Sequence, residues 1–179
     1  RHLGRYTSFY YRATTLFVEI MEPYRKKISS FLPFVLILAY FVMIFAWPWN
    51  AVVKSKGARD YASYHYAVQA AWEGANPYQT ENLHRKAREE HTRRSVHPFF
   101  YPPPSLISML WAKPFSLHMG YRLFFWLNQL LLLGSFWQIH KWLRTPIWFL
   151  AFLALAFTPL ADSMKMGQLN LWILCLISF

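Results

Sequence analysis

The chain has 179 residues, of which 55% are hydrophobic and 20% aromatic, and its formal net charge is +11. An aromatic share this high, arranged in long apolar blocks, excludes an ordinary soluble domain and predicts an all-α, polytopic integral membrane protein. The positive charge flanks the apolar blocks, where it suits anionic membrane lipids, and no nucleic-acid-binding motif accompanies it, so we expect no nucleic-acid partner.

Residues 1–27 predict a basic amphipathic helix. From residue 5 to residue 22, aromatic and aliphatic side chains recur at spacings of three and four, and Arg12 and Glu19 fall on the opposite side. An arginine-rich helix with an aromatic face is typical of the membrane interface, where it lies flat. Packing on a soluble part of the protein would give the same pattern, so both interpretations stay open.

Residues 28–50 contain the first predicted transmembrane helix. The run from residue 31 to residue 49 has 19 residues without a charge, close to the roughly 20 that cross a bilayer. The basic cluster "RKK" at residues 25–27 precedes this run. Because positive charge collects on the cytoplasmic side of membrane helices, the cluster predicts a cytoplasmic N-terminus.

Residues 51–101 are predicted to form an extracytoplasmic loop with two short helices. Residues 60–73 place Tyr61 and Tyr64 on one helical face, and a Gly/Asn/Pro turn ends that helix. Residues 80–94 predict a second, solvent-exposed helix, and Glu90 belongs to its exposed pattern.

Residues 102–179 are predicted to add further transmembrane helices. Residues 121–142 give the clearest of these, whereas the apolar segments at 105–119 and 147–160 are shorter. The final apolar run, residues 169–179, has only 11 residues, about half of what a spanning helix needs. We therefore expect the chain to be part of a longer polytopic protein.

Asp60 has two competing interpretations. It directly precedes a helical pattern, where aspartate is a favoured N-cap. It also follows the first predicted span, where a carboxylate beside Tyr61 and Tyr64 would be partly desolvated and could serve as a general base. Spacing leaves both roles open, although the capping-box partner is missing because Ser63 stands where a glutamate or glutamine would be.

Other polar residues give weaker signals. His84, His91 and His97 lack the spacing of a zinc site, so no metal is expected. Gln168 and Asn170 stand at the start of an apolar run, where polar side chains are costly unless they are paired or used. No Walker loop, serine-hydrolase motif or HExxH pattern appears, which leaves soluble-type hydrolase or ATPase chemistry without support.

Several short motifs, taken in order, resemble the N-terminal half of glycosyltransferase family 87 over roughly residues 31–179. They are Asp60-x3-Tyr64-x2-Ala67, Gly74-Ala-Asn-Pro-Tyr78, Phe100-Tyr-Pro-Pro-Pro104, Pro114, Trp126 and Gly167-Gln-Leu-Asn170. The resemblance implies a GT-C fold, a polyprenyl-phosphate sugar donor, often of mannose, and an outer loop of short helices along the membrane surface. It also implies that an acid in the first extracytoplasmic loop, by position Asp60, is the catalytic base.

The leading hypothesis is a glycosyltransferase of the bacterial inner membrane. It would move mannose, or another hexose or pentose, from polyprenyl phosphate to an extracytoplasmic acceptor, with inversion. Asp60 is the candidate base, and the candidate substrate contacts are Arg59, Tyr61, Tyr64, His65, Tyr78, Gln168 and Asn170. No cofactor is expected besides the lipid-linked sugar, and the expected partners are membrane lipids and that donor. The alternative is a non-catalytic scaffold or accessory subunit of a larger membrane complex.

Overall fold

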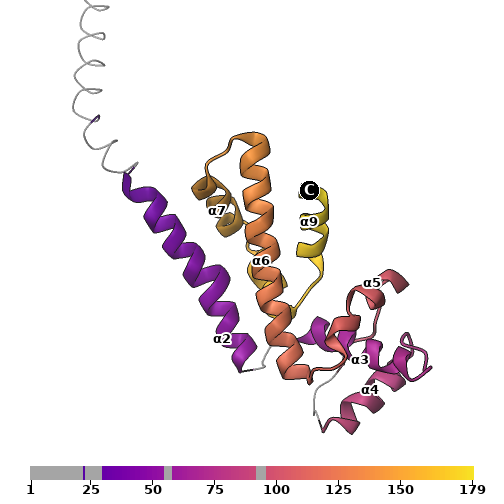
Figure 1. Ribbon diagram of the computed structural model, residues 1–179. Helices are drawn as coiled ribbons and strands as arrows, with labels where there is room; N and C mark the ends of the chain where they lie inside the picture. The colour runs from indigo at the N-terminus through magenta and orange to yellow at the C-terminus, as the bar shows by residue number, and fades with distance from the viewer. Residues whose placement is uncertain (1–21, 23–29, 55–57, 92–95) are drawn as a thin grey trace, which may run out of the picture.

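Figure 1 shows the computed structural model, which describes residue 22 and residues 30–54, 58–91 and 96–179. Apart from residue 22, the helix predicted at residues 1–27 lies outside the described residues. The described residues form helices and no strand, which confirms the all-α prediction for this part of the chain. The elements are η1 (Phe41–Ala46), α2 (Trp47–Val53), α3 (Arg59–Trp72), α4 (Thr80–Glu89), α5 (Pro103–Ser108), η2 (Leu110–Ala112), α6 (Leu117–Leu143), α7 (Ile147–Ala156), α8 (Pro159–Met166) and α9 (Asn170–Ser178).

One long helix precedes the loop that carries Asp60. It runs over Ser30–Val53, 24 residues that include η1 and α2. Its apolar side chains are largely exposed, as at Phe31 and Phe34, which suits contact with lipid. Of the helices among the described residues, this is the one that is long and apolar enough to cross a membrane by itself.

The later helices give a weaker membrane signal than the sequence predicts. α7 and α8 are long and apolar enough only as a pair, and they meet at a bend of 80°, as in a broken span or a re-entrant loop. Pro159 opens α8 and has no N–H to continue the preceding helix. α6 has 27 residues, but Asn128 and Gln129 halfway along it lower its hydropathy. A polytopic arrangement therefore stays a prediction.

The apolar segment at residues 105–119 does not form one membrane helix. It is broken into the end of α5, the single turn η2 and the start of α6. Pro114 follows η2 and explains why no helix continues from η2 into α6, whereas Pro102 lies before the segment and sets only where α5 begins.

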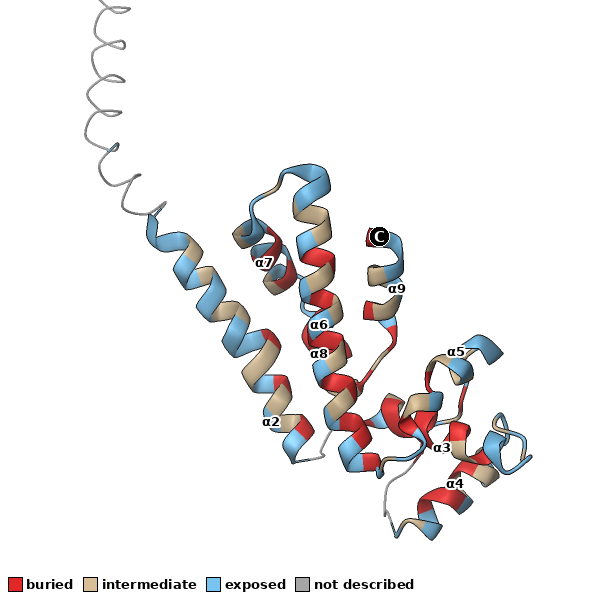
Figure 2. Ribbon diagram, in the orientation of Figure 1, coloured by how far each residue is buried: buried red, intermediate tan, exposed pale blue. Residues whose placement is uncertain are grey.

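The short helices gather at one end of the longer ones. In Figure 1, α3 lies beside the lower end of α6, α4 and α5 pack on α3 further from α6, and α9 runs along the upper part of α6. Figure 2 shows buried residues concentrated in α3 and on the facing sides of α6 and α8. The core therefore lies where α3 meets α6 and α8, and Asp60 belongs to the first turn of α3.

Candidate functional site

Asp60 is not the N-cap of α3. Ala58 holds that position with a left-handed φ of 62° and no side-chain cap bond. The N–H of Ala58 donates to the backbone oxygen of Lys165 at 3.3 Å, which fixes the start of α3 against α8. The capping interpretation of Asp60 is therefore wrong. Its side chain is half-buried in the first helical turn, where the helix dipole stabilises a negative group.

The carboxylate of Asp60 is bound by a glutamine from a distant part of the chain. Nε2 of Gln168 donates to Oδ2 of Asp60 at 2.9 Å, across 108 residues of sequence. The oxygen of the same amide accepts from Oγ of Ser163 and from Nδ2 of Asn170, each at 2.9 Å. We call these four residues the Asp60 cluster. Three predicted site residues, Asp60, Gln168 and Asn170, therefore meet, and Ser163 is a member that sequence reasoning missed.

Gly167 makes the turn that brings Gln168 to Asp60. It ends α8 with a left-handed φ of 75°, which glycine adopts without a Cβ penalty. The N–H groups of Gly167 and Gln168 both donate to the backbone oxygen of Ser163 at 3.0 Å. Gly167 also packs against Tyr61, so the turn is held directly on α3.

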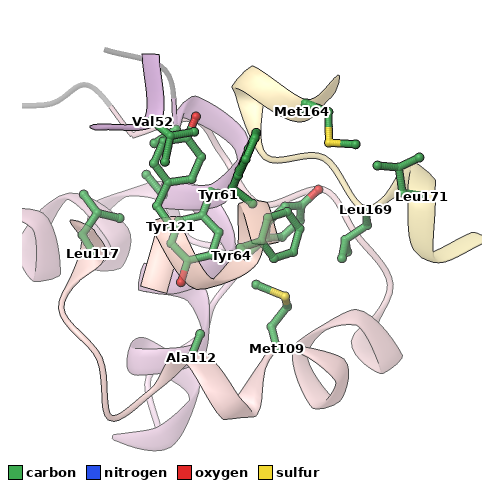
Figure 3. Close-up of a cluster of buried hydrophobic side chains, with 14 of the residues drawn as sticks. Val52, Tyr61, Tyr64, Met109, Ala112, Leu117, Tyr121, Met164, Leu169 and Leu171 are labelled. Carbon is green, nitrogen blue, oxygen red and sulfur yellow. The ribbon is translucent and has the colours of Figure 1, made fainter. Parts of the chain in front are cut away.

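Tyr61 and Tyr64, both predicted as substrate contacts, are fully buried (Figure 3). The ring of Tyr61 packs against the rings of Tyr121 and Phe124 at centroid distances of 5.6 and 5.3 Å. The ring of Tyr64 lies 4.7 Å from that of Tyr101. Burial raises the pKa of both hydroxyls, which keeps them neutral. In this structure the two rings support α3 from the core instead of lining an open groove.

His65 is also buried, within a polar cluster that includes Glu90. Nε2 of His65 lies 3.2 Å from Oε1 of Glu90. Gln69 and Tyr66 donate to the same carboxylate at 2.8 and 3.3 Å. Burial raises the pKa of Glu90, but the hydrogen bonds from these partners outweigh it and hold the pKa below its ordinary value. We call these four residues the His65 cluster.

The exposed position predicted for Glu90 is wrong. Its side chain is half-buried because α4 packs against α3 and brings this residue, next after α4, to His65. The helical pattern of α4 gave no sign of this contact, since the partner lies on another helix. The His65 cluster joins the two helices of the loop.

Arg59 and Tyr78, the remaining predicted contacts, are exposed. The hydroxyl of Tyr78 donates to the backbone oxygen of Tyr101 at 3.1 Å, and its ring lies 5.4 Å from that of Phe99. These contacts join the turn after α3 to the segment before α5. The described contacts of Tyr78 are therefore with that segment and not with the Asp60 cluster.

An apolar pocket of about 410 Å³ adjoins the Asp60 cluster. It lies among α6, α7, α8 and α9 and is lined mainly by side chains such as Leu132, Phe136 and Leu174. Ser163 and Asn170 are its polar lining residues, and both belong to the cluster. A pocket of this kind, apolar with a few polar groups, suits a ligand that has an apolar body and a polar end.

The Asp60 cluster presents one half-buried carboxylate oriented by one amide donor. A carboxylate held in this way can accept a proton from a hydroxyl group that approaches it. Across the described ranges, no group of three or more histidine, cysteine, aspartate or glutamate side chains is placed to hold a metal ion.

Comparison with known families agrees with the C-terminal motifs. Residues 99–179 match the family model described as glycosyltransferase family 87, and the match supports membership of that family. The matched stretch contains Gln168 and Asn170, whereas Asp60 lies before it. No curated protein and no solved structure matches the chain.

Proposed function

We propose that this chain, whose match over residues 99–179 supports membership of glycosyltransferase family 87, transfers a sugar from a polyprenyl-phosphate donor to an acceptor hydroxyl. The acceptor oxygen forms a bond to the anomeric carbon as the bond from that carbon to the phosphate oxygen breaks. The bonding electron pair leaves with polyprenyl phosphate, and Asp60 takes the acceptor proton. A single displacement of this kind inverts the anomeric configuration.

The observation that carries this proposal is the hydrogen bond between Gln168 and Asp60. It links the one acid singled out in the loop to the Gly167–Asn170 motif, which lies within the family match. A general base must be held in a fixed direction and still be reachable by substrate. The Gln168 amide meets the first requirement, and the partial exposure of Asp60 meets the second.

The apolar pocket supports a lipid-linked donor. A polyprenyl chain needs an apolar surface, and its phosphate and sugar need polar groups at one end of that surface. The pocket offers apolar walls from α6, α7 and α9, and shares Ser163 and Asn170 with the Asp60 cluster. A donor with its chain in this pocket would bring its polar end towards the carboxylate.

The proposed setting is the bacterial inner membrane, with the N-terminus in the cytoplasm and Asp60 on the opposite side. The helix Ser30–Val53 is apolar enough to cross the bilayer, and α3 follows it directly. The basic cluster before this helix favours a cytoplasmic start. Mannose remains the proposed sugar because of the family resemblance, and the acceptor is proposed to be extracytoplasmic.

A non-catalytic subunit of a larger membrane complex is the second candidate. The observation that favours it is the burial of Tyr61, Tyr64 and His65, which act as packing residues in this structure. This candidate predicts that the protein has no dependence on the Asp60 carboxylate and no transfer from a lipid-linked sugar.

The deciding experiment replaces Asp60 with asparagine in the purified protein in proteoliposomes. Transfer of labelled mannose from polyprenyl-phosphate mannose to a membrane acceptor extract is the readout. Because a general base contributes about 10²- to 10⁴-fold, we expect Asp60→Asn to reduce transfer at least about a hundredfold. Asp162→Asn is the matched control, because Asp162 is an exposed acid in the first turn of the neighbouring helix α8. Near-normal transfer by the Asp60 variant would exclude the proposed role.

A further inference from the structure

A second pocket, of about 350 Å³, lies where the end of the long helix meets α8. Its lining residues are Trp47, Asn50, Ala51, Lys54 and Lys165. The first four come from α2 and its C-cap, and Lys165 comes from the last turn of α8. We call it the lysine pocket. It brings two ammonium groups, one amide and one indole together from segments more than a hundred residues apart in sequence.

The two lysines have no acidic partner among the described residues. The ion pairs of the described chain involve other basic residues, and none of the residues that line the lysine pocket carries a carboxylate. Nζ of Lys165 lies 5.2 Å from the centre of the Trp47 ring, a cation–π contact. Two uncompensated positive charges that line one pocket form a site for an anion.

Hydrogen bonds to its backbone hold Lys165 in place, and they do not involve the charged side chain. Its carbonyl oxygen accepts hydrogen bonds from the N–H of Ala58 and from the hydroxyl of Tyr121. The position of this residue in the fold therefore does not depend on its side chain. The ammonium group is available for a ligand, and removing it should leave the contacts between α8, α3 and α6 intact.

A structural explanation exists for each lysine separately. A helix C-terminus carries partial negative charge, and Lys54 follows α2 as Lys165 ends α8. The dipole explains why lysine is favoured at each position. It does not explain why the two side chains line one pocket with Asn50, whose amide can donate a hydrogen bond to an anion.

The position of the pocket indicates the source of the anion. It lies at the C-terminal end of Ser30–Val53, the helix suited to cross a membrane. Trp47 and Val53 are exposed there, so apolar surface continues up to the pocket. Tryptophan and lysine at the end of a spanning helix lie at the depth of the lipid headgroups, where anionic lipids place their phosphates.

We propose that the lysine pocket binds the phosphate of an anionic membrane phospholipid. Lys54 and Lys165 bind the phosphate oxygens from two sides, Asn50 donates to it, and the acyl chains lie along the exposed face of the long helix. The proposal requires that the helix lies in a membrane and does not depend on glycosyl transfer. The bound lipid joins α2 to α8 beside the start of α3, which carries Asp60.

Lipid retention in native mass spectrometry tests this proposal. The purified protein is released from phosphatidylcholine nanodiscs that contain phosphatidic acid, and the affinity for each lipid is compared among variants. We expect wild type to retain phosphatidic acid in preference to phosphatidylcholine. Because a lysine near the membrane surface contributes about 1 kcal/mol, Lys54→Gln and Lys165→Gln should each weaken this affinity about fivefold.

Lys141→Gln is the matched control. Lys141 also lies in the last turn of a helix, and its Nζ is 5.3 Å from the centre of the Trp137 ring, but it does not line the lysine pocket. Its replacement should leave the affinity unchanged. Asp60→Asn should also leave lipid retention unchanged while it strongly reduces transfer, so a failure of the proposed function would not appear as a failure of this proposal.

Three outcomes would overturn the proposal. The first is equal retention of phosphatidic acid by wild type and by the double variant Lys54→Gln, Lys165→Gln. The second is binding of inorganic phosphate in a titration without any preference for the anionic lipid, which would make the pocket a site for free phosphate. The third is retention of polyprenyl phosphate alone, which would assign the pocket to the sugar donor.

Discussion

A Cβ atom added to Gly167 would lie 2.7 Å from the Cβ atom of Tyr61, and the φ of Gly167 is +75°. Both the space and the backbone conformation therefore require glycine at this position. The residue that follows is Gln168, which binds the Asp60 carboxylate one residue before Tyr61. Close packing of Gly167 on Tyr61 is thus one of the contacts that hold the two halves of the candidate site together, with the bonds from Ala58 to Lys165 and from Gln168 to Asp60.

We expect Gly167→Ala to lower the free energy of unfolding by about 2–4 kcal/mol, from left-handed strain and overpacking together. Gly74→Ala is the matched control, because Gly74 has the same kind of φ, +76°, and open space around it. The free energy of unfolding of that variant should fall only by the cost of the left-handed backbone, about 1–2 kcal/mol. Denaturant unfolding in detergent measures both. Equal losses would show that the contact with Tyr61 has no steric consequence.

Gln168→Ala tests whether the amide positions the carboxylate. We expect kcat for sugar transfer to fall about tenfold to a hundredfold with little change in KM for the donor, because a displaced catalytic group loses rate without losing substrate binding. Ser163→Ala removes a contact to the other end of the amide and leaves the Asp60 bond in place. Ser163→Ala should therefore reduce kcat less than Gln168→Ala does. A rise in KM with unchanged kcat in Gln168→Ala would assign the glutamine to binding instead.

The sequence predicted the members of the Asp60 cluster better than it predicted their arrangement. Asp60 and Gln168 were singled out separately, but nothing local indicates that they meet, because the contact depends on how α8 packs on α3. The aromatic face of α3 was also predicted, from side chains that recur every three or four residues. A period of three and four cannot distinguish a face that meets ligand from one that meets protein, and Tyr61 and Tyr64 proved to be buried.

The remaining differences have one local cause and two long-range causes. The apolar run at 105–119 is interrupted because Pro114 follows η2 and prevents a helix from continuing into α6. The N-cap of α3 fell on Ala58 because its N–H finds a partner in Lys165, a long-range contact that no cap motif encodes. The sequence predicted an exposed Glu90 because the helical pattern of α4 alone does not show that α4 packs on α3 and so buries this residue.

Glu90 should make stability depend on pH in the acidic range. Its pKa in the folded protein lies below the ordinary value of 4.5, so the carboxylate contributes stability that is fully present above about pH 4.5 and is lost as the pH falls through the folded pKa. We expect the difference in melting temperature between wild type and Glu90→Gln to be constant from neutral pH to about pH 4.5 and to shrink below it. Thermal unfolding at a series of pH values measures this. Glu81→Gln, an exposed glutamate of the neighbouring α4, is the matched control, and a difference that grows as the pH falls would contradict the assignment.

Gln129 should stabilise the packing of the long helix on α6. Its Nε2 donates to the backbone oxygen of Ile44 at 3.0 Å, and its Oε1 accepts from Tyr40 at 3.3 Å. A hydrogen bond within a protein contributes about 0.5–1.5 kcal/mol net, so Gln129→Leu should lower the free energy of unfolding by about that amount or somewhat more. Gln138→Leu is the matched control, since Gln138 is half-exposed on the same helix and the described residues supply it no hydrogen-bond partner. If the two leucine variants unfold at the same denaturant concentration, the bond to Ile44 does not contribute to holding the long helix on α6.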